Sequence, residues 1–210
     1  MVVKESIDKK DWCMDRKIIN ERISYIEATE EPLSADIGMI RDGDAEWLYD
    51  VGNDERSLEG LDGEYKVVLS HFHQDHTGSL DKVRTGELYV SGETFRHTGR
   101  GTVVNGELTI GDLRIFQIPS SHTKGCLGLE IGNEYAFVGD ALYCKAKDGC
   151  YAYNSQLLKD EIEVLKALKA PKLLVSHFQG MVRPKDEVIA ELEEIYSKRE
   201  KNNPYIIVGR

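Results

Sequence analysis

The segment KVVLSHFHQDHTG, residues 66–78, combines a short apolar run with three histidines and an aspartate. Its first five residues predict a strand that ends directly on His71. Alternate residues on an extended tail project to the same side, so His71 and His73 can converge on one ion. A turn after this pair would bring Asp75 and His76 to a second position. Imidazole nitrogen and carboxylate oxygen are ligands that zinc, iron or manganese accept, so the segment predicts a metal site.

The same arrangement recurs three times along the chain. Leu113 to Pro119 is a predicted strand before His122, Glu134 to Val138 is one before Asp140, and Lys172 to Ser176 is one before His177. Each of these three side chains, taken alone, could equally be a turn residue. Because four predicted strands end on ligand-type residues, we expect these side chains to meet in one cleft.

The other elements predict sheets covered by helices. Strands are expected over Lys17 to Ile26, Ser34 to Arg41 and Glu46 to Tyr49, the last two joined by a hairpin turn at residues 41–44. The apolar segment Asn203 to Arg210 could pair as an edge strand or contact another subunit. Amphipathic helices are expected over Asn154 to Ala170 and Pro184 to Lys201, and a further helix could open at His76 to Leu80. Hairpins followed by alternating strands and helices predict an α/β four-layer sandwich with two mixed sheets face to face and helices outside, in a single domain over 1–210.

Composition limits the partners. The chain has 210 residues and a formal net charge of -10, with dispersed lysines and arginines, which disfavours nucleic acid and acidic membranes. We therefore expect a small-molecule substrate and either a monomer or a homodimer. The N-terminal segment lacks the features of a secretory signal and no long apolar run follows, so a soluble, cytoplasmic protein is expected.

The cysteines do not predict a metal site or a disulfide scaffold. Cys13, Cys126, Cys144 and Cys150 are scattered without a Cys-x-x-Cys pair. Cys126 and Cys144 fall beside predicted ligands, but small packing residues are the simpler interpretation.

The motifs together resemble the metallo-β-lactamase superfamily. HFHQDH matches its His-x-His-x-Asp-His motif, SHTKG its downstream histidine segment, FVGDA its Gly-Asp strand end and SHFQG its last histidine region. The resemblance spans residues from about 17 to 183 and includes an early Asp-x-Gly turn that begins at Asp50. It implies the four-layer αββα fold of that superfamily.

The resemblance also implies two divalent metal ions, with zinc expected and iron or manganese as alternatives. The first would be bound by His71, His73 and His122, the second by Asp75, His76 and His177, and Asp140 would bridge them. Water held between two dications loses a proton near neutral pH, and the resulting hydroxide could attack an ester, lactone, thioester or small phosphodiester. No other cofactor is expected.

Several further residues are candidates for roles at this site. Asp75 and Asp140 are expected to act in catalysis as well as in metal binding, and Tyr143 is either a proton donor or part of the wall. Asp50 could orient a metal-bound imidazole or simply form its turn. Lys145 and Lys147 could attract an anionic substrate or belong to a solvated loop.

Other functions of the same fold stay open. Persulfide dioxygenases bind one iron through two histidines and an aspartate, which His71, His122 and Asp140 could provide, and a non-catalytic metal-binding module is a third reading. Flavodiiron oxidoreductases typically carry Glu where this chain has His73, which favours hydrolysis. The short segment after His177 leaves little room for the helical glutathione-binding region of glyoxalase II enzymes, so a glutathione thioesterase is disfavoured.

Overall fold

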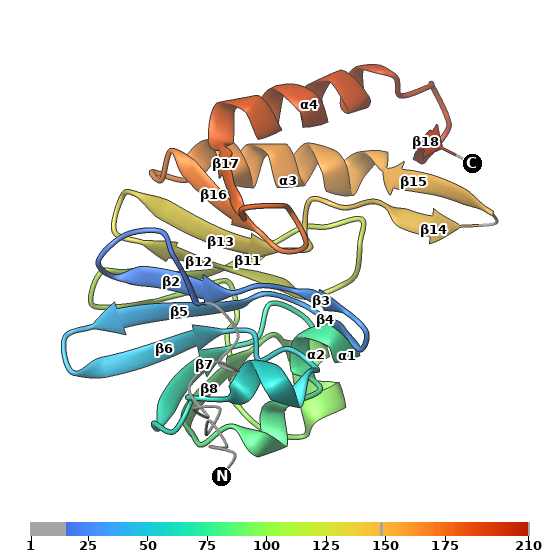
Figure 1. The fold of residues 1–210 in the computed structure, drawn as a ribbon. Coiled ribbons are helices and arrows are strands. Elements are labelled where there is room, and N and C mark those ends of the chain that lie inside the picture. Colours follow the sequence, from blue (N-terminus) through green and yellow to red (C-terminus); the bar gives the residue numbers. More distant parts are fainter. Residues whose placement is uncertain (1–15, 148, 210) are drawn as a thin grey trace, which may run out of the picture.

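The computed structural model describes residues 16–147 and 149–209, which form two large sheets packed face to face (Figure 1). The N-terminal segment with Cys13 lies outside the described residues, so the expectations drawn from it stay predictions.

The first sheet has seven strands in the order β1-β2-β5-β6-β7-β8-β9. They are β1 (Arg16–Ile18), β2 (Ile23–Ile26), β5 (Ile37–Asp42), β6 (Ala45–Tyr49), β7 (Tyr65–Val68), β8 (Thr85–Val90) and β9 (Thr102–Val103). Pairing is antiparallel from β1 to β6 and parallel from β6 to β9. Val67 and Val68 are both fully buried although neighbours on a strand face opposite sides, so β7 is covered on both faces.

The second sheet has six strands in the order β10-β11-β12-β13-β16-β17. They are β10 (Glu107–Ile110), β11 (Leu113–Ile118), β12 (Cys126–Ile131), β13 (Tyr135–Gly139), β16 (Lys172–Val175) and β17 (Val182–Pro184). Only β13 and β16 pair parallel in this sheet as described. Both large sheets are therefore mixed, as predicted.

Helices cover the outer faces of the sheets. They are α1 (Gln74–Thr77), α2 (Gly92–Thr98), α3 (Ser155–Ala167) and α4 (Lys185–Ser197), with 3-10 turns η1 (Glu55–Leu58) and η2 (Leu80–Lys82). The carboxamide oxygen of Asn154 accepts from the backbone N–H groups that open α3, and Pro184 precedes α4. Both long helices were predicted, with ends that extend a few residues too far. Within the described residues, no helix combines the length and apolar character needed to cross a membrane.

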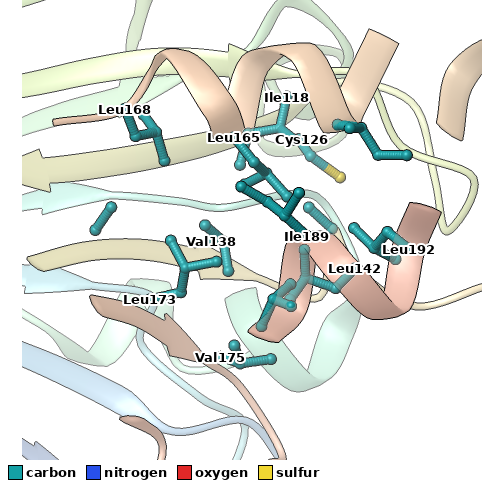
Figure 2. Close-up of a cluster of buried hydrophobic side chains, with 14 of the residues drawn as sticks. Ile118, Cys126, Val138, Leu142, Leu165, Leu168, Leu173, Val175, Ile189 and Leu192 are labelled. Carbon is teal, nitrogen blue, oxygen red and sulfur yellow. The ribbon is translucent and has the colours of Figure 1, made fainter. Parts of the chain in front are cut away.

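Three clusters of buried apolar side chains separate the layers. Between the sheets, the rings of Tyr49 and Phe137 stack with centroids 4.8 Å apart. Between the second sheet and the helices α3 and α4, Leu165 and Ile189 pack over Val138 (Figure 2). A third cluster lies on the other face of the first sheet, beneath η2. This layering confirms the four-layer αββα sandwich.

Two small sheets complete the fold. One contains β14 (Lys145–Lys147), β15 (Cys150–Asn154) and β18 (Tyr205–Gly209), and the other is the hairpin of β3 (Thr29–Glu30) and β4 (Leu33–Ser34). β18 lies at one edge of the three-stranded sheet, which confirms the predicted C-terminal edge strand.

Some predicted boundaries are wrong. The strand expected over Lys17 to Ile26 is two strands, because the Asn20 side chain accepts from the backbone N–H groups of Arg22 and Ile23 and turns the chain. The strand expected from Ser34 is interrupted before Ile37, and its first residue belongs to β4. The helix expected to open at His76 instead begins at Gln74 and ends at Thr77.

One charged residue of α3 lies in the apolar core. Glu161 is fully buried, and neither of its carboxylate oxygens has a hydrogen-bond partner among the described residues. Burial raises the pKa of Glu161 well above the ordinary 4.5. The carboxyl therefore stays protonated in the native state at pH values above about 4.5, where the unfolded chain has lost this proton. The free energy of unfolding therefore falls as the pH rises from about 4.5 toward the native pKa, by at most about 1.4 kcal/mol per pH unit.

Glu161→Gln should remove this pH dependence. We expect the variant to unfold at higher denaturant concentration than the wild type at pH 8, with little difference at pH 4.5. Glu163→Gln on the same helix is the matched control, since the Glu163 side chain is 66% exposed. Equal midpoints of wild type and Glu161→Gln at pH 8 would show that the buried carboxyl is not held neutral.

Candidate metal centre

The exits of four strands converge at one place in the sandwich. The structure brings together all seven side chains expected from the sequence, which are His71, His73, Asp75, His76, His122, Asp140 and His177. β7 leads to the first two and α1 carries the next two, whereas β11, β13 and β16 lead to the others. The expected convergence of distant segments is therefore observed.

The first group consists of His71, His73 and His122, whose candidate ligand atoms lie within 4.8 Å of one another. His73 Nδ1 is 3.0 Å from His122 Nε2. His71 is fully buried, and its Nδ1 lies 2.9 Å from the Ser70 hydroxyl. That contact leaves Nε2 of His71 for the centre of the group.

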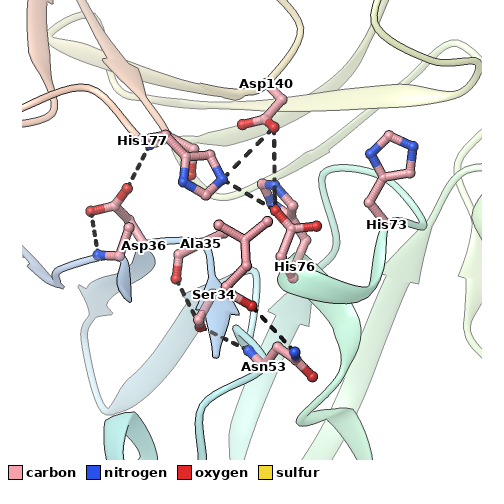
Figure 3. Close-up of polar contacts among 12 residues, drawn as sticks. Ser34, Ala35, Asp36, Asn53, His73, His76, Asp140 and His177 are labelled. Carbon is pink, nitrogen blue, oxygen red and sulfur yellow. Dashed lines mark hydrogen bonds and ion pairs between the residues drawn. The ribbon is translucent and has the colours of Figure 1, made fainter. Parts of the chain in front are cut away.

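The second group consists of Asp75, His76, Asp140 and His177 (Figure 3). Asp75 Oδ2 lies 3.2 Å from His177 Nε2 and 3.5 Å from His76 Nε2. Asp75, His76 and His177 are the three donors that the resemblance implies for a second ion.

Asp140 stands between the groups. Its Oδ2 lies 3.3 Å from His76 Nε2 and 3.5 Å from His122 Nε2, which belong to different groups. The preceding Gly139 has φ 54°, and a Cβ there would lie 2.8 Å from the Cβ of Ser70. Glycine is therefore needed to turn Asp140 into the site against the exit of β7.

Asp50 holds the second group from behind. Its Oδ2 lies 2.7 Å from His76 Nδ1, and its Oδ1 accepts from the Ser70 backbone N–H at 2.7 Å. Asp50 also has φ 62° in the Asp-x-Gly turn, but its carboxylate oxygens contact Ser70 and His76 rather than capping the backbone of that turn. The interpretation as an orienting partner therefore holds, and the contact directs Nε2 of His76 into the site.

The charges of the site favour a cation at the second group. Burial lowers the pKa of His76, but the carboxylates of Asp50 and Asp140 outweigh it and raise the value to about 10. Burial and the neighbouring imidazoles lower the pKa of His71, which keeps that ring neutral. The neutral form of imidazole is the one that binds metal. The carboxylates that stabilise a positive charge on His76 would in the same way stabilise a metal dication beside it.

Unpartnered atoms show that a metal fits. His71 Nε2, His76 Nε2 and Asp140 Oδ1 are buried without a hydrogen-bond partner among the described residues. Buried polar atoms normally find partners, and these three belong to residues of the two donor groups. Imidazole and carboxylate are also donors that zinc, iron and manganese accept, so the residues fit divalent ions.

Sequence reasoning missed Asp36. Its Oδ2 accepts from the His177 backbone N–H at 2.8 Å and its Oδ1 accepts from the Ala28 backbone N–H at 3.1 Å (Figure 3). His177 has φ 58°, a conformation that needs such support. The available signal was an aspartate, Asp36, among the mainly apolar residues of the strand predicted over Ser34 to Arg41.

Replacing Asp36 should loosen His177. Asp36→Ala leaves two partly buried N–H groups without their acceptor, so we expect the free energy of unfolding to fall by about 1–3 kcal/mol. Metal titration should also show weaker binding, with Asp44→Ala as an exposed control. Unchanged metal affinity in Asp36→Ala would mean that the contact does not position His177.

The remaining candidates lie around the site. The Tyr143 hydroxyl donates to the Ser176 carbonyl at 2.6 Å, and burial followed by the charge of Asp140 raises its pKa to about 12. Its role as a proton donor stays a prediction that would require this bond to break. Lys145 is exposed, and its charge adds to burial in lowering the pKa of His73. The Lys147 side chain lies outside the described residues.

The cysteines behave as packing residues. Cys126 is buried in the cluster beneath α3, and burial raises the pKa of its thiol to about 12. Cys144 packs against the same cluster.

Solved structures share this fold. The DIM-1 metallo-β-lactamase superposes with a TM-score of 0.65 at 14% identity, covering 87% of this chain and 96% of that one. A metallo-β-lactamase from Hirschia baltica gives a TM-score of 0.64 at 16% identity, covering 89% and 98%. The chain therefore has the metallo-β-lactamase fold, as the resemblance in its sequence implied.

A curated relative is a hydroxyacylglutathione hydrolase from Actinobacillus pleuropneumoniae serotype 5b (strain L20). It is 32% identical over 107 residues, which are 49% of this chain and 46% of that protein. The match thus spans about half the length of the relative. No family model matches the chain.

Proposed function

We propose that this protein is a metal-dependent hydrolase with two divalent ions. The first ion would be held by His71, His73 and His122, the second by Asp75, His76 and His177, and Asp140 would be shared. The position of Asp140 Oδ2 between the two donor groups carries this proposal. Two nearby dications repel, and a shared carboxylate offsets that repulsion.

The protein groups then have separable tasks. Bound divalent ions would supply a lowered water pKa and polarise the oxygen of the electrophile. Asp50 holds the His76 ring in the tautomer that presents Nε2, and Asp36 holds the backbone of His177. Asp75 stays within 3.2 Å of His177 Nε2, where it adds negative charge to the second position.

Zinc is the metal that we propose. Three histidines at one position are a donor set that zinc accepts with a site left for water. Iron and manganese also accept these donors, so the metal must be measured.

Carboxylic thioesters are the first substrates to test, followed by esters, lactones and small phosphodiesters. The curated relative is named for a hydroxyacyl derivative of glutathione, and an acyl group on that thiol is a thioester. Thioesters of glutathione and of other thiols therefore belong in the same panel. β-Lactams are included because the structural neighbours carry that name.

Elemental analysis combined with this panel tests the proposal. We expect about two metal ions per chain and turnover of at least one carbonyl or phosphodiester substrate, lost on chelation and regained on adding metal. One iron per chain with oxygen consumption on persulfides would instead indicate a dioxygenase. Metal binding without turnover of any substrate would indicate a non-catalytic module.

A further inference from the structure

A cavity of about 410 Å³ adjoins the second donor group. It lies between the segment from β2 to β4 on one side and the loop after β16 on the other, and His177 and Asp36 are in its wall. Since His177 is a proposed ligand, a molecule in this cavity would lie directly beside the metal centre. The cavity is therefore the place where part of a substrate can extend away from the reacting bond.

Acidic side chains outnumber basic ones in the lining of the cavity. Glu27 and Glu30 are exposed side chains in its lining, and apart from His177 the described residues that line it include no basic side chain. Lys17 lies 3.5 Å from Glu27, an exposed pair that offsets only part of this charge. The field reaches Tyr25 in the wall, where burial first, then the charges of Glu27 and Asp36, raise its pKa.

The cavity also has apolar walls open to solvent. The side chains of Leu33 and Phe178 are 56% and 41% exposed, and both belong to the lining. Arg183 lies with its guanidinium 5.0 Å from the ring centroid of Phe178, so this ring already accepts a cation on one face. An aromatic face and nearby carboxylates together attract organic cations more than simple ions.

We propose that this cavity binds a positively charged, partly apolar group of the substrate, such as an alkylammonium. The inference rests on the proposed hydrolase function and names the substrate class of that same site. A thioester or ester with a cationic amino or ammonium substituent would place this group beside Glu27 and Glu30. Hydrolysis would then break its acyl–sulfur or acyl–oxygen bond with one water, releasing a carboxylate, a proton and the thiol or alcohol.

The cavity changes the expectation for charge. An anionic substrate was the hypothesis drawn from Lys145 and Lys147, and the field of Lys145 acts on His73 of the first group. The carboxylates of Glu27 and Glu30 would repel an anion that extends into the cavity.

Binding of two matched probes tests the cavity without any hydrolysis. Choline and 3,3-dimethylbutanol have the same shape and differ in one positive charge. In NMR titrations of the metal-loaded protein, we expect choline to bind at least about threefold more tightly and to shift the amide signals of Thr29 and Gln179. Equal affinities, or choline shifts elsewhere, would overturn the proposal.

Paired variants separate the local charge from the global charge. Glu27→Gln combined with Glu30→Gln should abolish the preference for choline. Glu193→Gln combined with Glu194→Gln on the exposed face of α4 removes the same net charge and should keep it. A preference that survives the first pair, or disappears equally in both, would contradict a specific cation site.

Hydrolysis distinguishes this inference from the proposed function. The propanoyl thioester of thiocholine is compared with that of its neutral isostere, 3,3-dimethylbutanethiol, and we expect a several-fold higher kcat/KM for the cationic one. Hydrolysis of both at equal rates would contradict the proposed cation site but support the proposed hydrolase function. Selective choline binding with no turnover of either thioester, or of the wider panel, would contradict the hydrolase function but support the cation site.

Discussion

Asp140→Asn is expected to lower kcat/KM of the metal-loaded protein by about 10³-fold or more for its best substrate. Asp140 Oδ2 lies within 3.5 Å of nitrogen atoms in both donor groups, so the substitution removes a negative charge that both positions would share. The bound metal should fall from about two ions to one or fewer. Steady-state kinetics and elemental analysis of the same preparation measure both effects.

A surface carboxylate provides the control. The Asp81 side chain is 94% exposed and pairs with Arg100, so Asp81→Asn should retain both metals and wild-type turnover. Retention of full activity by Asp140→Asn with two bound ions would contradict the shared-carboxylate arrangement. Loss of activity with a cooperative unfolding transition preserved would support it.

Asp50→Asn is expected to weaken metal binding or activity by about 10- to 100-fold. The asparagine oxygen can still accept from the Ser70 N–H, but its amide would donate to His76 Nδ1. The ring proton would then sit on Nε2, the atom that faces Asp140, and block that donor. Asparagine tolerates the positive φ of position 50, so the backbone is kept.

The tautomer argument has a direct control. Asp50→Gly also tolerates the positive φ but removes the amide that would donate to His76 Nδ1, leaving the Ser70 hydroxyl 3.3 Å from that nitrogen, so it should lose less affinity for metal than Asp50→Asn. Competition with a chromophoric chelator measures both. If the glycine variant is the weaker binder of the two, Asp50 acts by supporting the backbone at Ser70 and the ring of His76 rather than by setting the tautomer, because both variants lack the charge.

The convergence of the candidate ligands could be predicted because four of them follow predicted strands. A short, mainly apolar strand followed within four residues by a histidine or aspartate is a local pattern, and His71, His122, Asp140 and His177 all have it. The sheet then brings these exits together by strand pairing, for example the parallel pairing of β13 and β16. Layer order followed from the same alternation of strands and helices.

Contacts between distant segments could not be predicted in this way. Asp36 supports His177 across 141 positions of the chain, and Tyr143 bonds to a carbonyl 33 positions away. Glu161 is different, because it lies three residues after Leu158 and four before Leu165 and so shares their helix face. Helical spacing alone would have identified it as buried.

Anomalous diffraction from crystals of the zinc-loaded protein, recorded on both sides of the zinc edge, locates the ions themselves. We expect two peaks, one among His71, His73 and His122 and one among Asp75, His76 and His177, with the carboxylate of Asp140 reaching both. A single peak in the site, or peaks away from both donor groups, would contradict a binuclear centre.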